Sequence, residues 1–125
     1  MVLLVEDDAG LRGMLHRSLE RAGYTVIAAA HGREALEQAR VRTIDLVVTD
    51  ILMPEMDGFE LIRRLRAEWP ELPIIAMSGI HDAPNFRNLA FKYGAKAALS
   101  KPVGRAQLIE IVRRIAANES ESPAA

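Results

Sequence analysis

The sequence predicts an α/β fold, a doubly wound sheet of five parallel strands with helices on both faces. Short apolar runs alternate about five times with segments in which apolar residues recur at helical spacing. The runs are continuously apolar, which is typical of strands buried on both faces. Together these patterns favour a parallel sheet, for which right-handed crossovers leave few possible topologies.

The predicted strands are short runs of apolar and β-branched residues, bounded by charged or turn-forming residues. In chain order we expect them at residues 2–5, 24–29, 44–49, 74–77 and 95–100. The last run carries the weakest signal, because Lys96 and three alanines do not favour β structure. The third strand ends at Asp50, and the fourth ends at Ser78-Gly79.

The predicted helices begin and end at recognisable signals. Gly23 is expected to stop the first helix, and Gly32 to open the second. Asp57 is expected to cap the third, and Asp82 with Pro84 to start the fourth. The residues expected to face inward are Leu11, Met14, Leu15, Leu19, Ala22, Ala35, Leu36, Ala39, Phe59, Ile62, Leu65, Phe86, Leu89, Ala90, Tyr93, Leu108, Ile111, Val112 and Ile115.

The composition excludes several kinds of site and gives no support for some classes of partner. The 125 residues are half hydrophobic, so we expect one domain at residues 1–117 and a flexible tail or linker start at 118–125. Without cysteine, neither a disulfide nor a thiolate metal site can form. The net charge of −1, with both signs interspersed, gives no indication of nucleic-acid or membrane binding. No signal peptide or membrane span is recognisable, which favours a cytoplasmic protein.

Polar residues stand where the predicted strands end. The first strand ends in Glu6-Asp7, the third in Asp50, the fourth in Ser78 and the fifth in Lys101. In a parallel sheet these ends share one edge, where ligands of open α/β sheets bind. Clustered carboxylates with oxygen ligands alone favour a hard cation, Mg²⁺ or Mn²⁺ in its place. A carboxylate such as that of Asp50 can attack an activated phosphoryl group and form an acyl phosphate.

Each of these residues also has an ordinary structural interpretation. Asp8 is better explained as a helix cap than as a metal ligand. Glu6 and Asp7 could be solvated loop acids, Asp50 and Ser78 turn residues, and Lys101 a surface lysine. Their recurrence at successive strand ends is what favours a functional site.

Four segments together resemble the receiver domain of two-component response regulators, including the chemotaxis regulators. They are residues 5–8 (VEDD), residues 50–58 (DILMPEMDG), Ser78-Gly79 and Lys101-Pro102. The resemblance runs from Val2 to about Ala117. It implies a flavodoxin-like (βα)5 fold with the strand order 2-1-3-4-5.

The resemblance also implies roles for individual residues. Asp50 would be the phosphoacceptor and a metal ligand. Asp7 would bind Mg²⁺ directly, Glu6 would support it through water, and the backbone carbonyl of Leu52 would be a third protein ligand. Lys101 would contact the phosphoryl group.

The same resemblance implies a switch, with one departure. Ser78 would be the switch hydroxyl, and the Lys101-Pro102 bond would be cis. A coupled aromatic residue normally lies three positions before the lysine, but this chain has Ala98 there. Either another group, such as Tyr93, replaces the aromatic residue, or the output is coupled differently.

The implied partners are a histidine kinase or a histidine phosphotransfer protein, and a downstream protein. The downstream protein would bind the face made by the fourth helix, fifth strand and fifth helix. The chain would catalyse only its own phosphorylation and slow dephosphorylation, so we do not expect an enzyme with an external substrate. A stand-alone receiver and a piece of a longer regulator or hybrid kinase both stay open.

Two alternatives come from other functional classes. A pseudo-receiver, which binds proteins without phosphorylation, is disfavoured by the intact acids and lysine. A hydrolase of the aspartyl-phosphate kind needs a second carboxylate two residues after the nucleophile. Leu52 occupies that position here.

Overall fold

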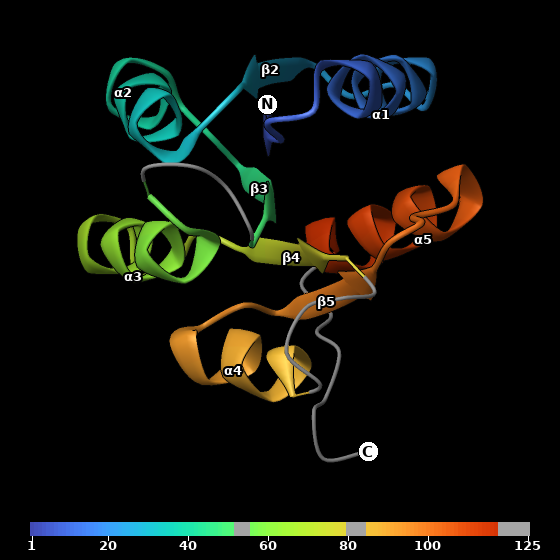
Figure 1. Ribbon diagram of the computed structural model, residues 1–125. Coiled ribbons are helices and arrows are strands. Elements are labelled where there is room, and N and C mark those ends of the chain that lie inside the picture. Colours follow the sequence, from blue (N-terminus) through green and yellow to red (C-terminus); the bar gives the residue numbers. More distant parts are fainter. Residues whose placement is uncertain (52–55, 80–84, 118–125) are drawn as a thin grey trace.

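Five parallel strands and five helices alternate along the chain, which confirms the predicted fold (Figure 1). The computed structural model describes residues 1–51, 56–79 and 85–117. The strands, in the spatial order β2-β1-β3-β4-β5, are β1 (Val2–Val5), β2 (Val26–Ala29), β3 (Leu46–Asp50), β4 (Ile74–Ser78) and β5 (Ala97–Ser100). The helices are α1 (Ala9–Arg21), α2 (Gly32–Val41), α3 (Gly58–Glu68), α4 (Phe86–Tyr93) and α5 (Arg105–Ala116).

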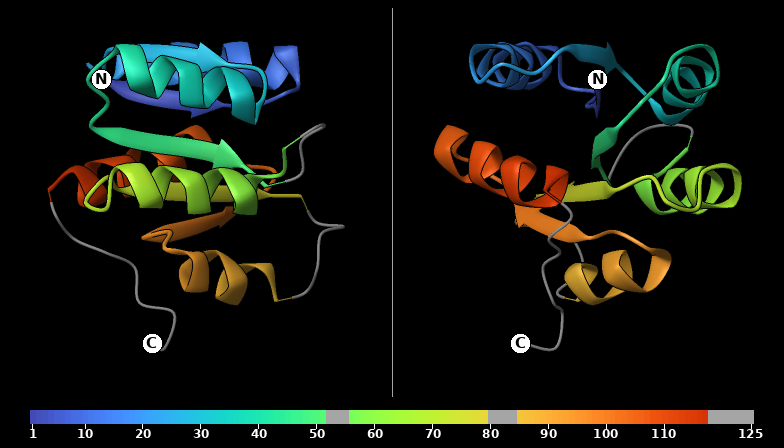
Figure 2. Two further views of the ribbon diagram at one scale, coloured as in Figure 1. Left: turned by 90° about the vertical axis from the view of Figure 1, so that its left-hand side faces the viewer. Right: turned by 180° about the vertical axis from the view of Figure 1, so that it is seen from behind.

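The sheet is sandwiched between two helical layers (Figure 2). Successive strand residues point to opposite faces. Leu3 and Val47 therefore pack with α2, α3 and α4, whereas Leu4 and Val48 pack with α1 and α5. The apolar runs of β1, β3 and β4 are buried throughout, whereas the middle of β2, at Ile27 and Ala28, is only partly buried. The polar residues that end the strands lie at the edge of the sheet, where the apolar core ends.

Side-chain caps start three of the helices. Asp8 accepts a hydrogen bond from the Leu11 amide at 2.9 Å, which confirms its interpretation as a cap. Asp57 caps α3 through the Glu60 amide at the same distance of 2.9 Å. The sequence interpretation missed the cap of α2, where Nδ1 of His31 accepts from a backbone amide. The three capped helix starts follow β1, β2 and β3, at the sheet edge that carries the candidate site.

The expectations for α4 need one correction. Tyr93 was expected to face inward, but it is 41% exposed. Its ring instead packs at the surface against Phe59 of α3, with centroids 5.4 Å apart. The helix is short and Gly94, with φ +115°, ends it directly after Tyr93, so only Phe86 and Ala90 are buried. Asp82 and Pro84, the expected start signals, lie outside the described residues.

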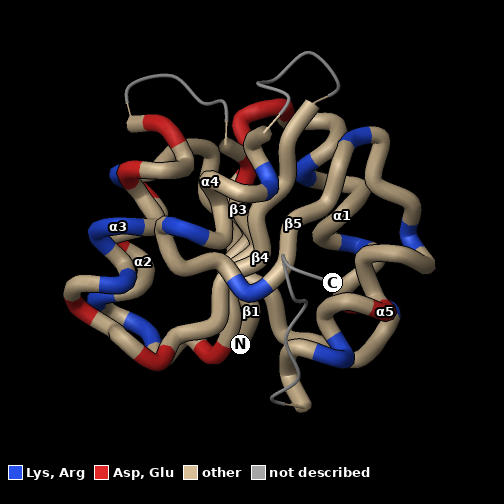
Figure 3. Tube along the Cα trace, turned by 90° about the horizontal axis from the view of Figure 1, so that it is seen from below, with Lys and Arg blue, Asp and Glu red and all other residues tan. Residues whose placement is uncertain are grey.

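Figure 3 shows a run of acidic residues at the upper edge of the sheet, and further acidic residues mixed with Lys and Arg along the helices. Within the described ranges, no helix has the length and apolar character needed to cross a membrane.

Candidate functional site

The site lies at the edge where the parallel strands end. Val5 pairs with Thr49, and Asp50 pairs with Met77, so the residues that follow β1 lie beside the last residue of β3. The Glu6 amide continues the ladder by one hydrogen bond of 3.0 Å, to Ala29 of β2. The strand register, rather than sequence proximity, therefore brings these acids together.

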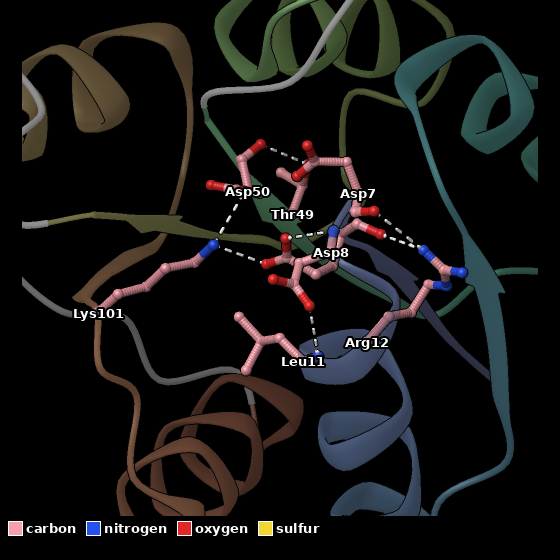
Figure 4. A network of polar contacts seen from close by, with 8 residues as sticks. Asp7, Asp8, Leu11, Arg12, Thr49, Asp50 and Lys101 are labelled. Atoms are coloured by element: carbon pink, nitrogen blue, oxygen red, sulfur yellow. Dashed lines mark hydrogen bonds and ion pairs between the residues drawn. The ribbon is translucent and has the colours of Figure 1, made fainter.

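Three carboxylates meet at this edge, and two of them, Asp7 and Asp50, are labelled in Figure 4. Glu6, Asp7 and Asp50 each offer a carboxylate oxygen, and these oxygens lie within 4.8 Å of one another. Glu6 and Asp50 are almost fully buried, whereas Asp7 is exposed. An all-oxygen set with one open side fits a hard divalent cation that keeps part of its water. The structure thus brings together the acids that the sequence pointed to.

Lys101 reaches into the acidic group from the end of β5. Its Nζ lies 2.7 Å from Oε1 of Glu6, as an ion pair, and donates a 2.9 Å hydrogen bond to Oδ2 of Asp50. Burial lowers the pKa of Lys101, but the hydrogen bonds to Glu6 and Asp50 outweigh it, so the pKa is raised and the ammonium stays charged. The peptide bond between Lys101 and Pro102 is cis, as expected.

Glu6 is the acid most altered by this environment. Burial raises the pKa of Glu6 to about 7, and the negative charge of Asp50 acts in the same direction. Hydrogen bonds from Lys101 and from the Asp8 amide oppose the shift without cancelling it. Near pH 7, the Glu6 carboxyl is therefore partly protonated when no divalent cation is bound at the site.

We expect the protein without divalent cations to lose stability as the pH rises from about 5 to 8. The raised pKa means that the folded state holds the Glu6 proton more tightly than the unfolded chain does. The free energy of unfolding therefore falls between the ordinary glutamate pKa and about 7, by up to about 3 kcal/mol. Urea unfolding in EDTA at several pH values measures this. Glu6→Gln should flatten the dependence, and an equally pH-independent wild type would contradict the interpretation.

Ser78 is buried at the end of β4. Its Oγ is inaccessible and has no hydrogen-bond partner among the described residues. A buried hydroxyl without a partner is costly. An oxygen-bearing group arriving at Asp50, on the neighbouring strand, is the kind of partner that would satisfy it.

Two residues that the sequence interpretation missed fix the backbone of the site. Thr49, fully buried, donates from its hydroxyl to the carbonyl oxygen of Asp50 at 2.9 Å. Arg12 of α1 donates to the carbonyl oxygens of Glu6 and Asp7. Neither contact has a sequence signal beyond the presence of a polar residue next to the acids.

The Leu52 carbonyl and Ala98 are the two remaining positions that the resemblance singled out. The backbone carbonyl of Leu52, expected as a metal ligand, lies outside the described residues. Ala98, at the position where an aromatic residue was expected from the resemblance, is completely buried in β5. Its carbonyl oxygen accepts a hydrogen bond from Arg87 of α4, so α4 and β5 are joined beside this small side chain.

Comparisons with known proteins agree with this architecture. The family model described as the response regulator receiver domain matches residues 2–113. Response regulator MprA of Mycolicibacterium vanbaalenii is 37% identical over 114 residues, which cover 91% of this chain and 49% of MprA. The alkaline phosphatase synthesis transcriptional regulatory protein PhoP of Bacillus subtilis is 35% identical over 126 residues, with 96% and 52% covered. The chain thus spans about half the length of these curated relatives.

Solved structures show the same fold. Chemotaxis protein CheY4 of Vibrio cholerae superposes with a TM-score of 0.85 and 33% identity, covering 91% of this chain and 96% of CheY4. A putative response regulator from Chloroflexus aurantiacus gives a TM-score of 0.87 and 35% identity, covering 93% and 96%. The strand order and the helical layers described above are those of these receivers.

Proposed function

Because the chain belongs to the response regulator receiver domain family, we propose that it accepts a phosphoryl group on Asp50. The donor would be a histidine kinase or a histidine phosphotransfer protein of a two-component system. The observation that carries this proposal is the pairing of Asp50 with Lys101 at the sheet edge, at 2.9 Å, beside two further carboxylates. A nucleophile, a fixed cation and a metal-binding set are the components that phosphoryl transfer needs.

The chain's own residues would act as follows. A carboxylate oxygen of Asp50 attacks the phosphorus of the phosphohistidine, forming a P–O bond while the P–N bond breaks. The imidazole leaves with the electron pair and takes a proton from solvent. Lys101, already within 2.9 Å of Asp50, neutralises charge on the transferring oxygens. The buried hydroxyl of Ser78 donates a hydrogen bond to one of them.

The acidic set would hold the metal ion. Asp7 and Asp50 are the proposed direct ligands, Glu6 the support through water, and the Leu52 carbonyl the further ligand. A bound Mg²⁺, or Mn²⁺ in its place, neutralises negative charge on the acids and on the incoming phosphoryl oxygens. The exposed position of Asp7 beside two buried acids leaves the open side that such an ion and its donor require.

Signalling would follow from a shift between two states of one fold. The proposed output surface is the face of α4, β5 and α5, which would bind a downstream protein more or less tightly after phosphorylation. Because Ala98 cannot rotate as an aromatic side chain does, the coupling from Ser78 would run through other contacts between α4 and β5. We propose no turnover of an external substrate, only self-phosphorylation and slow loss of the phosphoryl group.

Asp50→Asn tests the proposal directly. After incubation with acetyl phosphate and Mg²⁺, the intact mass of the wild type should increase by one phosphoryl group, whereas Asp50→Asn should show no adduct. The amide removes the nucleophilic oxygen while keeping the shape of the side chain. Beryllium fluoride, which stands in for a phosphoryl group, should likewise bind only the wild type.

Asp57→Asn is the matched control, because Asp57 is an acid of the same edge whose role is to cap α3. It should still be phosphorylated. A wild type that takes up no phosphoryl group with any donor or Mg²⁺ concentration would contradict the proposal and favour the pseudo-receiver alternative.

A further inference from the structure

We propose that Arg12 is a positioning residue of the metal-binding group, which holds the backbone that presents Glu6 and Asp7. The inference deepens the proposed function and rests on it for the identity of the cation. Arg12 has no part in the phosphoryl transfer proposed for Asp50, but its side chain faces the carbonyl side of the acidic segment (Figure 4).

The contact joins a helix to the loop that precedes it. Arg12 lies in the first turn of α1, and its side chain runs back toward the end of β1. Its Nη1 donates to the carbonyl oxygen of Glu6 at 2.9 Å and to that of Asp7 at 3.4 Å. One guanidinium nitrogen therefore bridges the carbonyls of the two consecutive residues whose carboxylates belong to the site.

These carbonyls need such a partner because of where they lie. β1 ends at Val5 and α1 begins at Ala9, so Glu6 and Asp7 lie between the strand ladder and the helix. The hydrogen bond to the Glu6 carbonyl is partly buried and that to the Asp7 carbonyl is exposed, and carbonyl groups outside regular structure take partners from side chains or water. A charged donor makes the stronger hydrogen bond. The hydrogen bond to the Glu6 carbonyl fixes the peptide plane between Glu6 and Asp7, and the bond to the Asp7 carbonyl restrains the next plane, so the directions in which the two carboxylates leave the backbone are held.

Among the described residues, the other hydrogen bonds of this segment do not hold the peptide plane between Glu6 and Asp7. The Glu6 amide is bound to Ala29, and the Asp8 amide donates to Oε2 of Glu6 at 3.1 Å. Asp8 itself is occupied as the cap of α1. Each of these bonds anchors one end of the segment. The bridging contact from Arg12 anchors its middle, next to Asp7, the exposed member of the acidic set.

A purely electrostatic role predicts the opposite effect on metal affinity. A guanidinium near three carboxylates repels an incoming divalent cation, so its removal should strengthen cation binding. A positioning role predicts that its removal weakens binding, because the carboxylates lose their fixed geometry. Mutation of groups that orient metal ligands typically weakens metal binding by about 10–100-fold. The sign of the change therefore separates the two roles.

The test is the Mg²⁺ affinity of the full chain by isothermal titration calorimetry, with thermal unfolding recorded in parallel. Arg12→Gln should bind Mg²⁺ about tenfold more weakly than the wild type. Arg12→Lys, which keeps the charge on a shorter side chain without the planar fork, should fall between the two. Arg17→Gln, an exposed arginine of the same helix, should leave the affinity unchanged.

Unchanged or tighter binding by Arg12→Gln would overturn the inference, as would a wild type that binds no Mg²⁺. If Arg12→Gln fails to fold, the affinity of Arg12→Lys decides. The outcome is separable from that of the proposed function. Weaker binding in the Arg12 variants combined with no phosphoryl adduct on Asp50 would support the positioning role and reject the proposed phosphorylation. Normal phosphorylation of the Arg12 variants with unchanged Mg²⁺ affinity would support the proposed phosphorylation and reject the positioning role.

Discussion

Lys101→Met is expected to slow phosphorylation of Asp50 by about a hundredfold, the usual cost of removing one preorganised group that neutralises charge in the transition state. The ammonium lies 2.9 Å from Oδ2 of Asp50 and 2.7 Å from Oε1 of Glu6. Methionine keeps the length and the apolar stem of the side chain but removes the charge. The rate should therefore fall even though Asp50 and the metal-binding acids are intact.

The same substitution should destabilise the protein when divalent cations are absent. Lys101 is the cation that faces two buried carboxylates, whose side chains are 1% and 5% exposed. Removing one partner of a buried ion pair leaves an uncompensated charge, and we expect a loss of about 2–3 kcal/mol at pH 8. Burial already raises the pKa of Glu6 to about 7, and loss of the lysine should raise it further. The destabilisation should consequently shrink as the pH falls and Glu6 takes up a proton.

The measurements are the rate of adduct formation with acetyl phosphate, by intact mass, and urea unfolding in EDTA at pH 8 and pH 5. Lys92→Met, at an exposed position of α4, is the control for loss of a lysine charge. It should change neither quantity appreciably. Equal rates for Lys101→Met and the wild type would contradict the role given to Lys101, and a pH-independent stability difference would contradict the link to Glu6.

The elements and the main site residues could be predicted from the sequence because they follow from one geometric rule. Parallel strands bring their carboxyl ends to one edge, so Glu6, Asp50 and Lys101 were expected to lie near one another once the strands were recognised. The burial of the strands was equally readable from their continuous apolar runs. Even β5, the least favourable strand by composition, forms because it can pair with β4 and pack under α4.

Apart from the caps by Asp8 and Asp57, the contacts between side chains and backbone could not be predicted. The bond from Thr49 to the Asp50 carbonyl and the bridge from Arg12 depend on how the chain turns after each strand. Nothing in residue type or spacing encodes that turn. The cap by His31 was missed for a similar reason, since histidine is not among the usual capping residues. Tyr93 had the spacing of a buried residue, but α4 ends before its ring can reach the core.

Gly58→Ala is expected to affect both stability and the site, because Gly58 lies where α3 touches the end of β3. A Cβ atom at this position would lie 2.4 Å from the carbonyl oxygen of Asp50 and 2.6 Å from Cα of Ile51. Both are backbone atoms, so no side-chain rotation relieves the overlap. The Gly58 amide also donates to the Ile51 carbonyl at 2.7 Å, which holds the helix start against the strand end.

Alanine would push α3 away from the residue that carries the proposed phosphoacceptor. Overpacking against backbone costs about 3 kcal/mol, at the upper end of the usual range. A displacement of about 1 Å at a reacting group can slow a reaction about a hundredfold, so phosphorylation of Asp50 should also slow. Urea unfolding and the rate of adduct formation measure the two effects in one protein preparation.

Gly13→Ala is the matched control within a helix. Its Cβ would meet only the flexible end of Arg17, at 3.4 Å. Alanine in the middle of α1 should therefore raise the free energy of unfolding, by about 0.5–1 kcal/mol, and leave phosphorylation unchanged. Opposite signs for the two glycine substitutions would show that the close approach of α3 to the Asp50 backbone is what requires glycine at position 58. A Gly58→Ala protein as stable and as reactive as the wild type would contradict that conclusion.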